Sequence, residues 1–437
     1  MNNIIPVKDE LIIDQFPIRI PRLPNVPIPR VAMPTALQLK VRQRHTSIEA
    51  SEDKRRDNRF IHFAADRSGC GWWRFNMLEQ VANYGGKATI TNIDIMPDPG
   101  NLSFWRSGIK AVRLQRQATP NQLSFFKTLR RMIDDTHLGI RMIYEIDDVV
   151  VADKLPDYNA AKSAFNKKEI QDSIRELAEL CDEFTVVSPY MKKVYQEFAP
   201  KSHITVIPNY SSRSWFGHVF DENFVMNNYA ANKARPRVLL AGGGTHYRMF
   251  DLNPYSDSDF KHVNDAIIAA RNDFKFVWLG TYPAAMKPFI DSGVMEYHPW
   301  AHLLSFPWTI KELGCQVSTA PLADNDFNRA KSFIKFQEAC YEGIPFVGQD
   351  LEPYKMSWHT FNTGDEMIDR LKEVTKDEET YEKEVVRHHD EADNWYIDDK
   401  VDDIIRVYRT PYNDLSRFDC EWFSKYNERP VETNKDA

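Results

Sequence analysis

The sequence predicts an α/β protein composed of two doubly wound halves, each built on a parallel sheet. Short apolar runs that are typical of buried strands alternate with segments of helical periodicity through most of the chain. In each half, an early strand runs directly into a glycine turn, near residues 69 and 242. A polar stretch rich in serine and asparagine after residue 208 separates the two halves. A length of 437 residues is sufficient for two or three domains, each with its own core.

Composition and charge narrow the class of protein. Hydrophobic residues make up 42% and charged residues 27% of the chain, as in ordinary soluble globular proteins. The net charge of −7 argues against a uniformly basic nucleic-acid binder but leaves room for a local basic patch. The five cysteines are scattered and lack the spacing of zinc ligands, so we expect a reduced, cytoplasmic protein without a disulfide framework. No apolar run has the length of a transmembrane helix, so we expect no membrane insertion.

Residues 1–58 are predicted to form an extended arm. Six prolines between Pro17 and Pro34 disfavour helix and favour extended backbone. The arm is also basic, with arginines and lysines spread from Arg19 to Arg56. It is either a strap or dimerisation arm that packs on a protein surface, or a segment that contacts a polyanion by charge.

The first half is predicted to span residues 59–212. Its first strand, at residues 60–65, leads into a turn that contains Gly69 and Gly71 and opens a helix. Such glycines let backbone N–H groups approach an anion at the helix N-terminus, although the pattern is not a dinucleotide-binding fingerprint. Further strands are predicted at residues 88–95, 111–114, 140–146, 183–188 and 203–209, with helices at residues 122–133 and 170–181.

Two acidic residues, Asp147 and Asp148, directly follow the predicted strand at residues 140–146. Carboxylates at the carboxyl end of a buried strand lie where open α/β sheets place their ligand sites. The pair is therefore a candidate for binding or catalysis. The alternative is that these residues only cap the segment that follows.

The second half is predicted to span residues 213–393. Its first strand begins at Arg237 and runs into three glycines at residues 242–244, where the backbone can approach a phosphate. No Gly-Lys-Ser/Thr follows, which argues against a nucleoside triphosphatase. His246 and Arg248 come just after the glycines, and an arginine beside such a turn is a candidate phosphate partner. Further strands are predicted at residues 274–279, 316–320 and 345–348.

The most strongly patterned stretch comprises residues 321–345. It is expected to leave a strand, pass through a polar turn at residues 324–328 and enter a helix that ends at Gly343. One polar face of this helix is either solvated, with its charged residues paired along the helix, or presented to a ligand at the carboxyl edge of the sheet. The residues spaced to share it are Lys331, Lys335, Glu338 and Glu342.

The end of the chain is predicted to be helical. Acidic residues predominate at residues 375–393, which indicates an exposed helix. Residues 394–408 have the apolar spacing of a final amphipathic helix. Residues 394–437 are expected to form this helix, which crosses back to the first half, and a frayed tail.

These motifs together resemble retaining glycosyltransferases of the GT-B architecture, in particular the family-4-like group. The likeness runs over about residues 60–410 and implies two Rossmann-like domains that face each other across a cleft. Its weaker supports are the stretches Cys70–Arg74, Glu145–Asp148, Val206–Asn209 and Gly243–His246, with Asp259 and Phe260. Its most specific residues are Pro321, Leu322, Asn325, Phe327, Asn328, Lys331, Ser332, Lys335, Glu338, Gly343, Ile344 and Pro345.

The resemblance implies that the cleft binds a nucleotide-diphosphate sugar, UDP-linked, with no other cofactor and no metal. Glu338 matches the second glutamate of the group's E-x7-E pattern, which bonds the ribose hydroxyls. The position of the first glutamate holds Ala330, so Asn328 or Lys331 is expected to cover that space. The residues implied for the nucleotide sugar are Gly69, Gly71, Gly243, Gly244, His246, Arg248, Asn328, Lys331, Lys335 and Glu338.

The candidates for the transfer step are Asp147, Asp148 and Lys331. Lys331, together with Lys335 and Arg248, is expected to neutralise the leaving diphosphate. One of the two aspartates is expected to contact the acceptor hydroxyl. No residue is assigned as a covalent nucleophile, because a retaining enzyme of this kind does not need one.

The acceptor is less clearly indicated. Similar phage enzymes transfer glucose or arabinose to hydroxymethylcytosine in duplex DNA, and the basic arm and the high aromatic content favour that acceptor. The other glycosyltransferase alternative is a cell-surface polysaccharide or a lipid-linked sugar. Two further alternatives are a non-catalytic DNA-binding or structural protein and a nucleotide-sugar epimerase.

Overall fold

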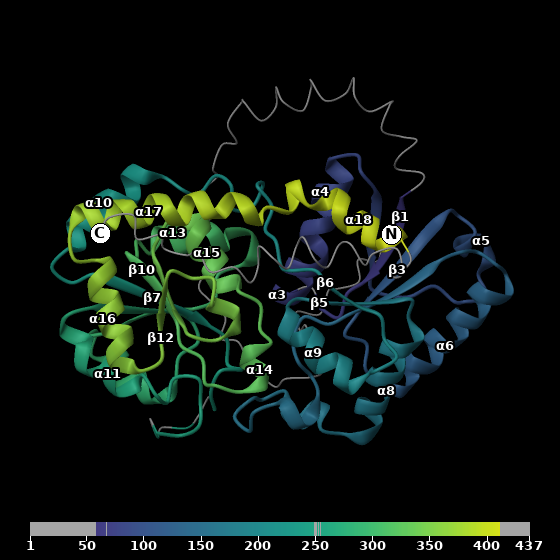
Figure 1. Ribbon diagram of the computed structural model, residues 1–437, viewed down its shortest axis with the longest axis horizontal. Helices are drawn as coiled ribbons and strands as arrows, with labels where there is room; N and C mark the ends of the chain where they lie inside the picture. The colour runs from purple at the N-terminus through teal and green to yellow at the C-terminus, as the bar shows by residue number, and fades with distance from the viewer. Residues whose placement is uncertain (1–57, 67, 249–250, 252, 254, 411–437) are drawn as a thin grey trace, which may run out of the picture. The chain divides into compact units, whose positions relative to one another are not determined.

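The computed structural model describes residues 58–66, 68–248, 251, 253 and 255–410. In this part of the chain, the strands form two parallel sheets of six strands, one in each half (Figure 1). The α/β architecture of two doubly wound halves is therefore confirmed. The predictions for the basic arm, Asn58 apart, and for the tail after residue 410 lie outside the described residues.

The first sheet has the strand order β2-β1-β3-β4-β5-β6. Its strands are β1 (Arg59–Phe63), β2 (Thr89–Ile93), β3 (Ile109–Gln115), β4 (Arg141–Glu145), β5 (Glu183–Val186) and β6 (Ile204–Val206). The helices of this half are α3 (Gly69–Gly71), which continues as a π-helical turn (Trp72–Asn76), α4 (Met77–Tyr84), α5 (Leu102–Trp105), α6 (Pro120–Asp135), α7 (Lys162–Phe165), α8 (Lys168–Leu180) and α9 (Pro189–Phe198).

The second sheet has the strand order β12-β11-β10-β7-β8-β9. Its strands are β7 (Arg237–Gly242), β8 (Lys275–Gly280), β9 (Glu296–His298), β10 (Val317–Ala320), β11 (Phe346–Gln349) and β12 (His359–Phe361). The helices of this half are α10 (Glu222–Asn232), α11 (Asn264–Ala269), α12 (Lys287–Asp291), α13 (Phe306–Glu312), α14 (Asp326–Arg329), α15 (Ile334–Glu342), α16 (Gly364–Val374) and α17 (Glu378–Ala392).

Local sequence signals explain several of these boundaries. Thr119 and Gln122 form a reciprocal capping box at the start of α6, and Pro120 occupies its first helical position. Ser188 caps α9 through a hydrogen bond from the backbone N–H of Met191. The predicted end of α15 at Gly343 is confirmed, because this glycine adopts the left-handed conformation, with φ at +67°.

The predicted continuous helix from Lys331 onward is wrong. The chain forms the short helix α14, breaks at Ala330 and starts again at Ile334, so Lys331 lies in the connection. The carbonyl of Ala330 accepts a hydrogen bond from the Ser188 hydroxyl of the first half at 2.7 Å instead of an intrahelical one. Ala330 itself packs, fully buried, with the apolar core of the first half. The shared face therefore begins only at Lys335.

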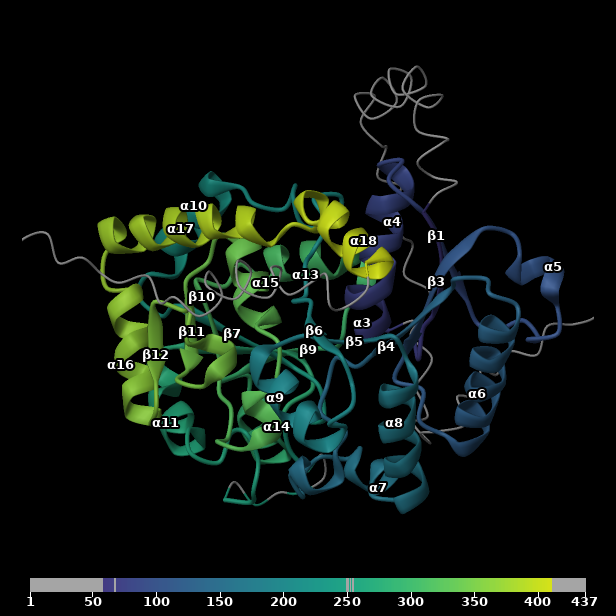
Figure 2. The ribbon, with the colours of Figure 1, turned by 45° about the vertical axis from the view of Figure 1, so that its right-hand side comes forward.

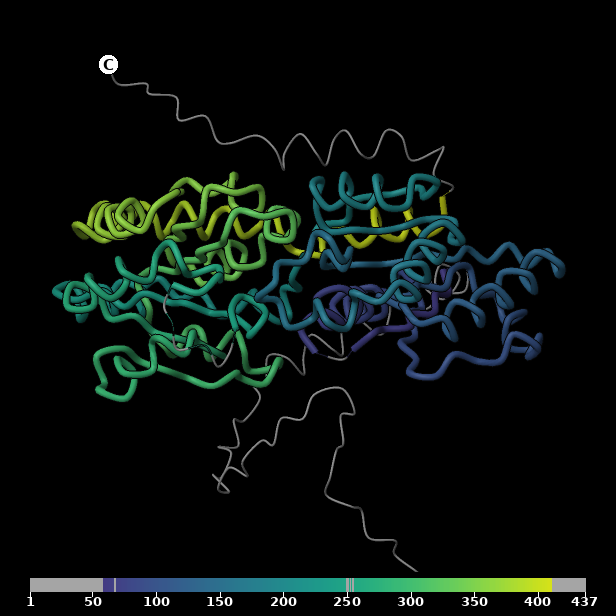
Figure 3. Tube along the Cα trace, turned by 90° about the horizontal axis from the view of Figure 1, so that it is seen from below, coloured from purple at the N-terminus to yellow at the C-terminus, as the bar shows by residue number. Residues whose placement is uncertain are grey.

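The C-terminal segment also differs from the prediction. Helix α17 is not exposed all round, because it buries Tyr381, Val385 and His388. The predicted helix over residues 394–408 consists of two short 3₁₀ turns, at residues 393–395 and 397–399, followed by α18 (Val401–Arg409). Helix α18 packs on the first half, where the Tyr408 ring meets that of Phe60 edge to face. The yellow segment in Figure 3 follows this path from the second half to the first.

Among the described residues, two chain segments connect the halves, and they lie side by side. Ser211, after β6, and Tyr396, after α17, form an isolated parallel bridge. The backbone N–H of Ile397 donates to the Ser211 carbonyl at 2.7 Å. Arg213 forms ion pairs with Asp393 and Asp399 of the other segment at 3.1 and 2.5 Å. The two connections, which Figure 2 shows beside α4 and α18, therefore form one hydrogen-bonded unit.

Candidate functional site

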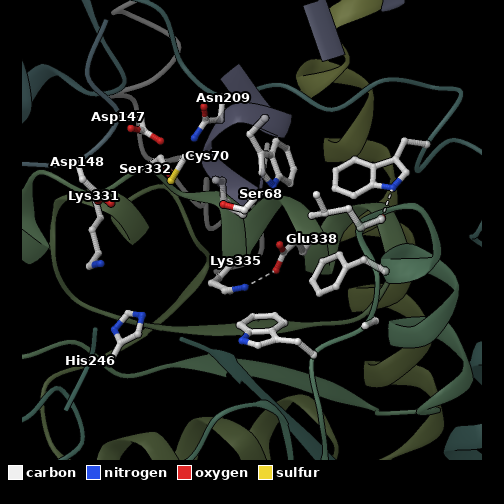
Figure 4. Close-up of a pocket in the computed structure, with 18 of the residues that line it drawn as sticks. Ser68, Cys70, Asp147, Asp148, Asn209, His246, Lys331, Ser332, Lys335 and Glu338 are labelled. Atoms are coloured by element: carbon white, nitrogen blue, oxygen red, sulfur yellow. Dashed lines mark hydrogen bonds and ion pairs between the residues drawn. The ribbon is translucent and has the colours of Figure 1, made fainter. Parts of the chain in front are cut away.

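A cavity of about 500 Å³ lies between the carboxyl ends of the two sheets. Side chains from both halves line it, and ten of them are labelled in Figure 4. From the first half come Ser68, Gly69, Cys70, Trp73, Asp147, Asp148 and Asn209. From the linker and second half come Trp215, His246, Trp300, Ala301, Leu303, Phe306, Lys331, Ser332, Ile334, Lys335, Glu338 and Tyr354.

The strand orders explain why the cavity lies at this edge. In the second sheet, β7 and β10 are neighbours from which the chain winds outward in opposite directions. Open α/β sheets bind ligands in the crevice beyond the carboxyl ends of such a pair. His246 follows β7 and Lys331 follows β10, so the topology brings these two distant side chains to one place.

The two glycines of the turn in the first half, Gly69 and Gly71, have different roles. Gly69 lines the cavity, and a Cβ atom there would meet nothing within 4 Å. Gly71 does not line the cavity, and a Cβ there would lie 2.0 Å from the carbonyl oxygen of Asp66. The Asp66 carboxylate accepts hydrogen bonds from the backbone N–H groups of Ser68 and Gly71 at 2.8 and 3.2 Å. Gly71 is therefore needed for the close fold of the turn.

Asp147 is a buried carboxylate in the wall of the cavity, with 9% of its surface exposed. Burial raises its pKa, Arg116 opposes that shift, and the charge of Asp148 adds to it. The Oδ1 atom lies 3.8 Å from Arg116 Nε and, within the described part of the chain, has no hydrogen-bond partner. A buried acceptor without a partner, beside a cavity, fits a ligand group that donates a hydrogen bond.

The opposite wall carries positive charge and a buried glutamate. Lys335 Nζ donates to Glu338 Oε2 at 2.8 Å, which Figure 4 marks with a dashed line. Only 6% of the Glu338 surface is exposed, and burial raises its pKa while Lys335 opposes the shift. Lys331 Nζ lies 4.3 Å from the centre of the Phe327 ring. Lys331 and Lys335 both line the cavity, and in Figure 4 the amine of Lys335 is directed at Glu338.

His246 lies beside this positive wall and has a fixed partner. Its Nδ1 atom is 2.6 Å from Oδ2 of Asp259, a fully buried carboxylate. Burial lowers the pKa of His246, and the charges of Lys331 and Lys335 lower it further despite Asp259. Burial alone would raise the pKa of Asp259, but its hydrogen bonds and neighbouring positive charges outweigh burial and lower it. At neutral pH the pair is thus a neutral imidazole and an ionised carboxylate.

The structure brings together most, but not all, of the predicted site residues. Gly69, Asp147, Asp148, His246, Lys331, Lys335 and Glu338 line the cavity. Gly71, Gly243, Gly244, Arg248 and Asn328 are absent from its lining. Arg248 is exposed, whereas the side chain of Asn328 is fully buried and donates hydrogen bonds to Asp259 and to the carbonyl of Ala323.

The aromatic wall of the cavity was not predicted. It consists of Trp73, Trp215, Trp300 and Phe306, from three separated parts of the sequence. A signal for Trp300 was present at Gly280, the last residue of β8. This glycine has a φ of +103°, and a Cβ there would lie 2.5 Å from the Trp300 ring.

Asn209 is held at the cavity by a buried charge network. Arg74 donates to Asn209 Oδ1 at 3.0 Å and to the carbonyls of Ile207 and Pro208 at 2.7 and 3.2 Å. Glu145 accepts from Arg74 and from a second buried arginine, Arg113. The pKa of Glu145 is lowered because these two arginines outweigh the effect of its burial. The network therefore fixes the start of the linker against the first half.

Two features are absent from the described residues. No group of three or more histidine, cysteine, aspartate or glutamate side chains there is arranged to hold a metal ion. None of the described helices combines the length and the apolar character needed to cross a membrane.

No protein-family model matches the chain, and no curated protein matches it either. Solved structures do match. Anabaena Alr3699/HepE in complex with UDP-glucose aligns with a TM-score of 0.52 and 9% identity over 80% of this chain and 98% of its own. An α-glucosyltransferase in complex with UDP and a 13-mer DNA containing an HMU base aligns with a TM-score of 0.50 and 10% identity, over 81% of this chain and 99% of its own.

The chain has the GT-B fold. The resemblance inferred from the motifs is thereby confirmed at the level of the fold. At 9–10% identity, the likeness does not extend to substrate or residue roles. The GT-B fold does give the cavity a structural context, because it lies between the two Rossmann-like domains.

Proposed function

We propose that this protein is a retaining glycosyltransferase that moves glucose or arabinose from a UDP-sugar to 5-hydroxymethylcytosine in phage DNA. The observation that carries the proposal is the chemistry of the two walls of the cavity. Two lysines and a buried glutamate face it from one domain, and two aspartates face it from the other. That arrangement fits a diphosphate and a ribose on one side and an acceptor hydroxyl on the other.

The donor is assigned to the wall of the second domain. Lys331 and Lys335 supply fixed positive charge for the diphosphate, whose negative charge grows as the glycosidic bond breaks. Glu338 accepts hydrogen bonds from the ribose hydroxyls through Oε1, since its Oε2 atom is already bonded to Lys335. His246 presents Nε2 to a hydroxyl of the sugar. HepE solved with UDP-glucose supports this choice of donor class.

The acceptor is assigned to the wall of the first domain. The Oδ1 atom of Asp147 accepts a hydrogen bond from the acceptor hydroxyl and orients it, with Asp148 beside it. No covalent residue is needed if the hydroxyl attacks from the face on which the diphosphate leaves. The α-glucosyltransferase solved with UDP and HMU-containing DNA supports DNA as the acceptor class. In duplex DNA the base would have to be flipped out of the stack to reach the cavity.

A donor-by-acceptor panel tests the proposal. The full chain is incubated with UDP-glucose, UDP-arabinose and other UDP-sugars, each with plain or hydroxymethylcytosine duplex DNA, and with carbohydrate acceptors. The DNA is then digested to nucleosides, and their masses are measured. We expect a mass gain of one sugar on hydroxymethylcytosine only, including in the presence of a metal chelator. Transfer to a carbohydrate but never to DNA would refute the DNA acceptor.

Nucleotide binding separates the enzyme from a non-catalytic DNA-binding protein. We expect UDP to raise the thermal unfolding temperature, because a ligand that binds only the folded state stabilises it. Absence of a shift with every nucleotide sugar would refute the enzyme. Donor conversion without an acceptor would instead indicate an epimerase.

The basic arm supplies a separate test of DNA as the acceptor. Deletion of residues 1–57 removes all lysines and arginines of the arm but keeps Asn58, whose side chain donates to the Lys87 carbonyl at 2.9 Å. We expect weaker DNA binding, with a smaller dependence on salt, and unchanged UDP binding. If the deletion leaves the DNA affinity unchanged, the arm does not contribute to DNA binding.

A further inference from the structure

Asp259 is the centre of a buried hydrogen-bond network. Its Oδ1 atom accepts from the Tyr158 hydroxyl at 2.5 Å, from the Asn328 amide, and from the backbone N–H of Ala323 at 3.2 Å. Its Oδ2 atom accepts from His246. A buried carboxylate with this many donors is held in one position, because any rotation would break several bonds at once.

The network joins the two domains. Tyr158 belongs to the first domain and is 6% exposed, whereas the other partners of Asp259 belong to the second. The Tyr158 hydroxyl also accepts hydrogen bonds from the amides of Asn325 and Asn328, at 3.0 and 3.2 Å. One hydroxyl of the first domain therefore bonds three side chains of the second.

Other contacts join the same two surfaces but end elsewhere. Tyr190 donates to Asp326 at 2.6 Å, and Lys154 forms an ion pair with the same carboxylate at 2.8 Å. Asp326 does not line the cavity. The contact through Asp259 differs, because its next member, His246, does line the cavity.

The network also determines which nitrogen of His246 carries the proton. An ionised carboxylate only accepts hydrogen bonds, so His246 Nδ1 must be the donor. Nε2 is then the acceptor nitrogen of the neutral ring. A histidine is commonly oriented in this way by the hydrogen bond of its other nitrogen.

We propose that Tyr158 is a positioning residue for the transfer reaction, which acts through Asp259 on the orientation and hydrogen bonding of His246. This inference rests on the proposed function for its catalytic consequence but not for the linkage itself. Because Tyr158 comes from the other domain, the linkage exists only when the two domains are in contact.

Tyr158→Phe removes one hydroxyl and keeps the ring. Asp259 then divides its charge among fewer donors, so its bond with His246 becomes stronger. The matched control is Tyr190→Phe, which removes a hydroxyl–carboxylate bond between the same domains without touching Asp259. Both variants are compared as full chains with the wild type, after thermal unfolding has shown that they fold.

The first measurement needs no substrate. In protein labelled with ¹⁵N-histidine, the Nδ1 proton resonance of His246 is assigned by its loss in His246→Gln. We expect this resonance to move downfield in Tyr158→Phe and to stay in place in Tyr190→Phe. In Asp259→Asn we expect the ¹⁵N shifts of His246 to lose the Nδ1–H pattern. An unmoved resonance in Tyr158→Phe, or an equal movement in the control, would overturn the linkage.

The second measurement is steady-state transfer. In Tyr158→Phe we expect kcat to fall on the order of tenfold while the donor KM stays within about twofold, because one hydrogen bond acting on geometry is lost. Tyr190→Phe should keep both constants within about twofold. Equal kinetics in the two variants would show that Tyr158 only holds the domains together. Without transfer activity in the wild type, the proposed function fails, and the resonance comparison still decides the linkage.

Discussion

Glu338→Gln isolates the contribution of one buried carboxylate to donor binding. The Glu338 side chain is 6% exposed, and only its Oε2 atom is bonded to Lys335, which leaves Oε1 for a ligand. The substitution keeps the volume of the side chain. In the proposed function that oxygen accepts from the ribose, and a hydrogen bond to a charged group is worth about 1.5–3 kcal/mol. The dissociation constant of UDP should therefore rise by roughly 10- to 150-fold.

Isothermal titration with UDP measures this effect without knowledge of the sugar or the acceptor. The matched control is Glu342→Gln, since Glu342 is also buried on α15, one turn further on, but does not line the cavity. Its Oε1 atom has no hydrogen-bond partner in the described part of the chain, and burial raises its pKa well above the usual value. The control should therefore bind UDP like the wild type and be no less stable.

Two results would refute the assignment of Glu338. One is an unchanged UDP affinity in Glu338→Gln, which would place the ribose elsewhere in the cavity. The other is an equal loss in both variants, which would mean that α15 as a whole, and not the cavity-facing carboxylate, sets the affinity.

Three further predictions concern the catalytic wall, the buried network and pH. Asp147→Asn should lower kcat with DNA on the order of 100-fold while UDP affinity stays within about twofold, as measured by transfer kinetics and titration. Arg74→Ala should lower the free energy of unfolding by about 3–5 kcal/mol in urea titrations, because it leaves Glu145 buried with one arginine fewer. His388 accepts from the backbone N–H of Phe346 at 3.0 Å, and burial lowers its pKa to about 4. Because the unfolded chain binds the proton more tightly, stability should fall by about 2 kcal/mol from pH 7 to pH 5 in the wild type, and by clearly less in His388→Gln.

Features that depend on short stretches of sequence could be predicted. Strands that end in glycine turns, and carboxylates at the end of a strand, follow from short patterns, so the two sheets and the places of Asp147 and Glu338 could be predicted. The break before Lys331 could not be predicted, because it depends on a hydrogen bond from Ser188, 142 positions earlier. The same applies to Tyr158, which nothing in its own neighbourhood distinguishes from an ordinary surface tyrosine.

Ala330 shows how such a long-range contact changes the meaning of a motif. Read as part of the E-x7-E pattern, it is a missing carboxylate. In the structure it is fully buried among apolar side chains of the first domain. A glutamate at this position would place a charge in that core at a cost of several kcal/mol. The departure from the pattern is therefore part of the way the two domains meet.

The paired connections at Ser211 and Tyr396 have a mechanical consequence. Two connecting segments that are hydrogen-bonded to each other and cross between the domains at one place form a hinge with a single axis. Twist between the domains would shear the bonds of Ser211 and Arg213, whereas rotation about the common line preserves them. A rotation that opens the cavity would have to break the bond of Tyr158 with Asp259 and also the contacts of Tyr190 and Lys154 with Asp326, so these contacts together oppose opening.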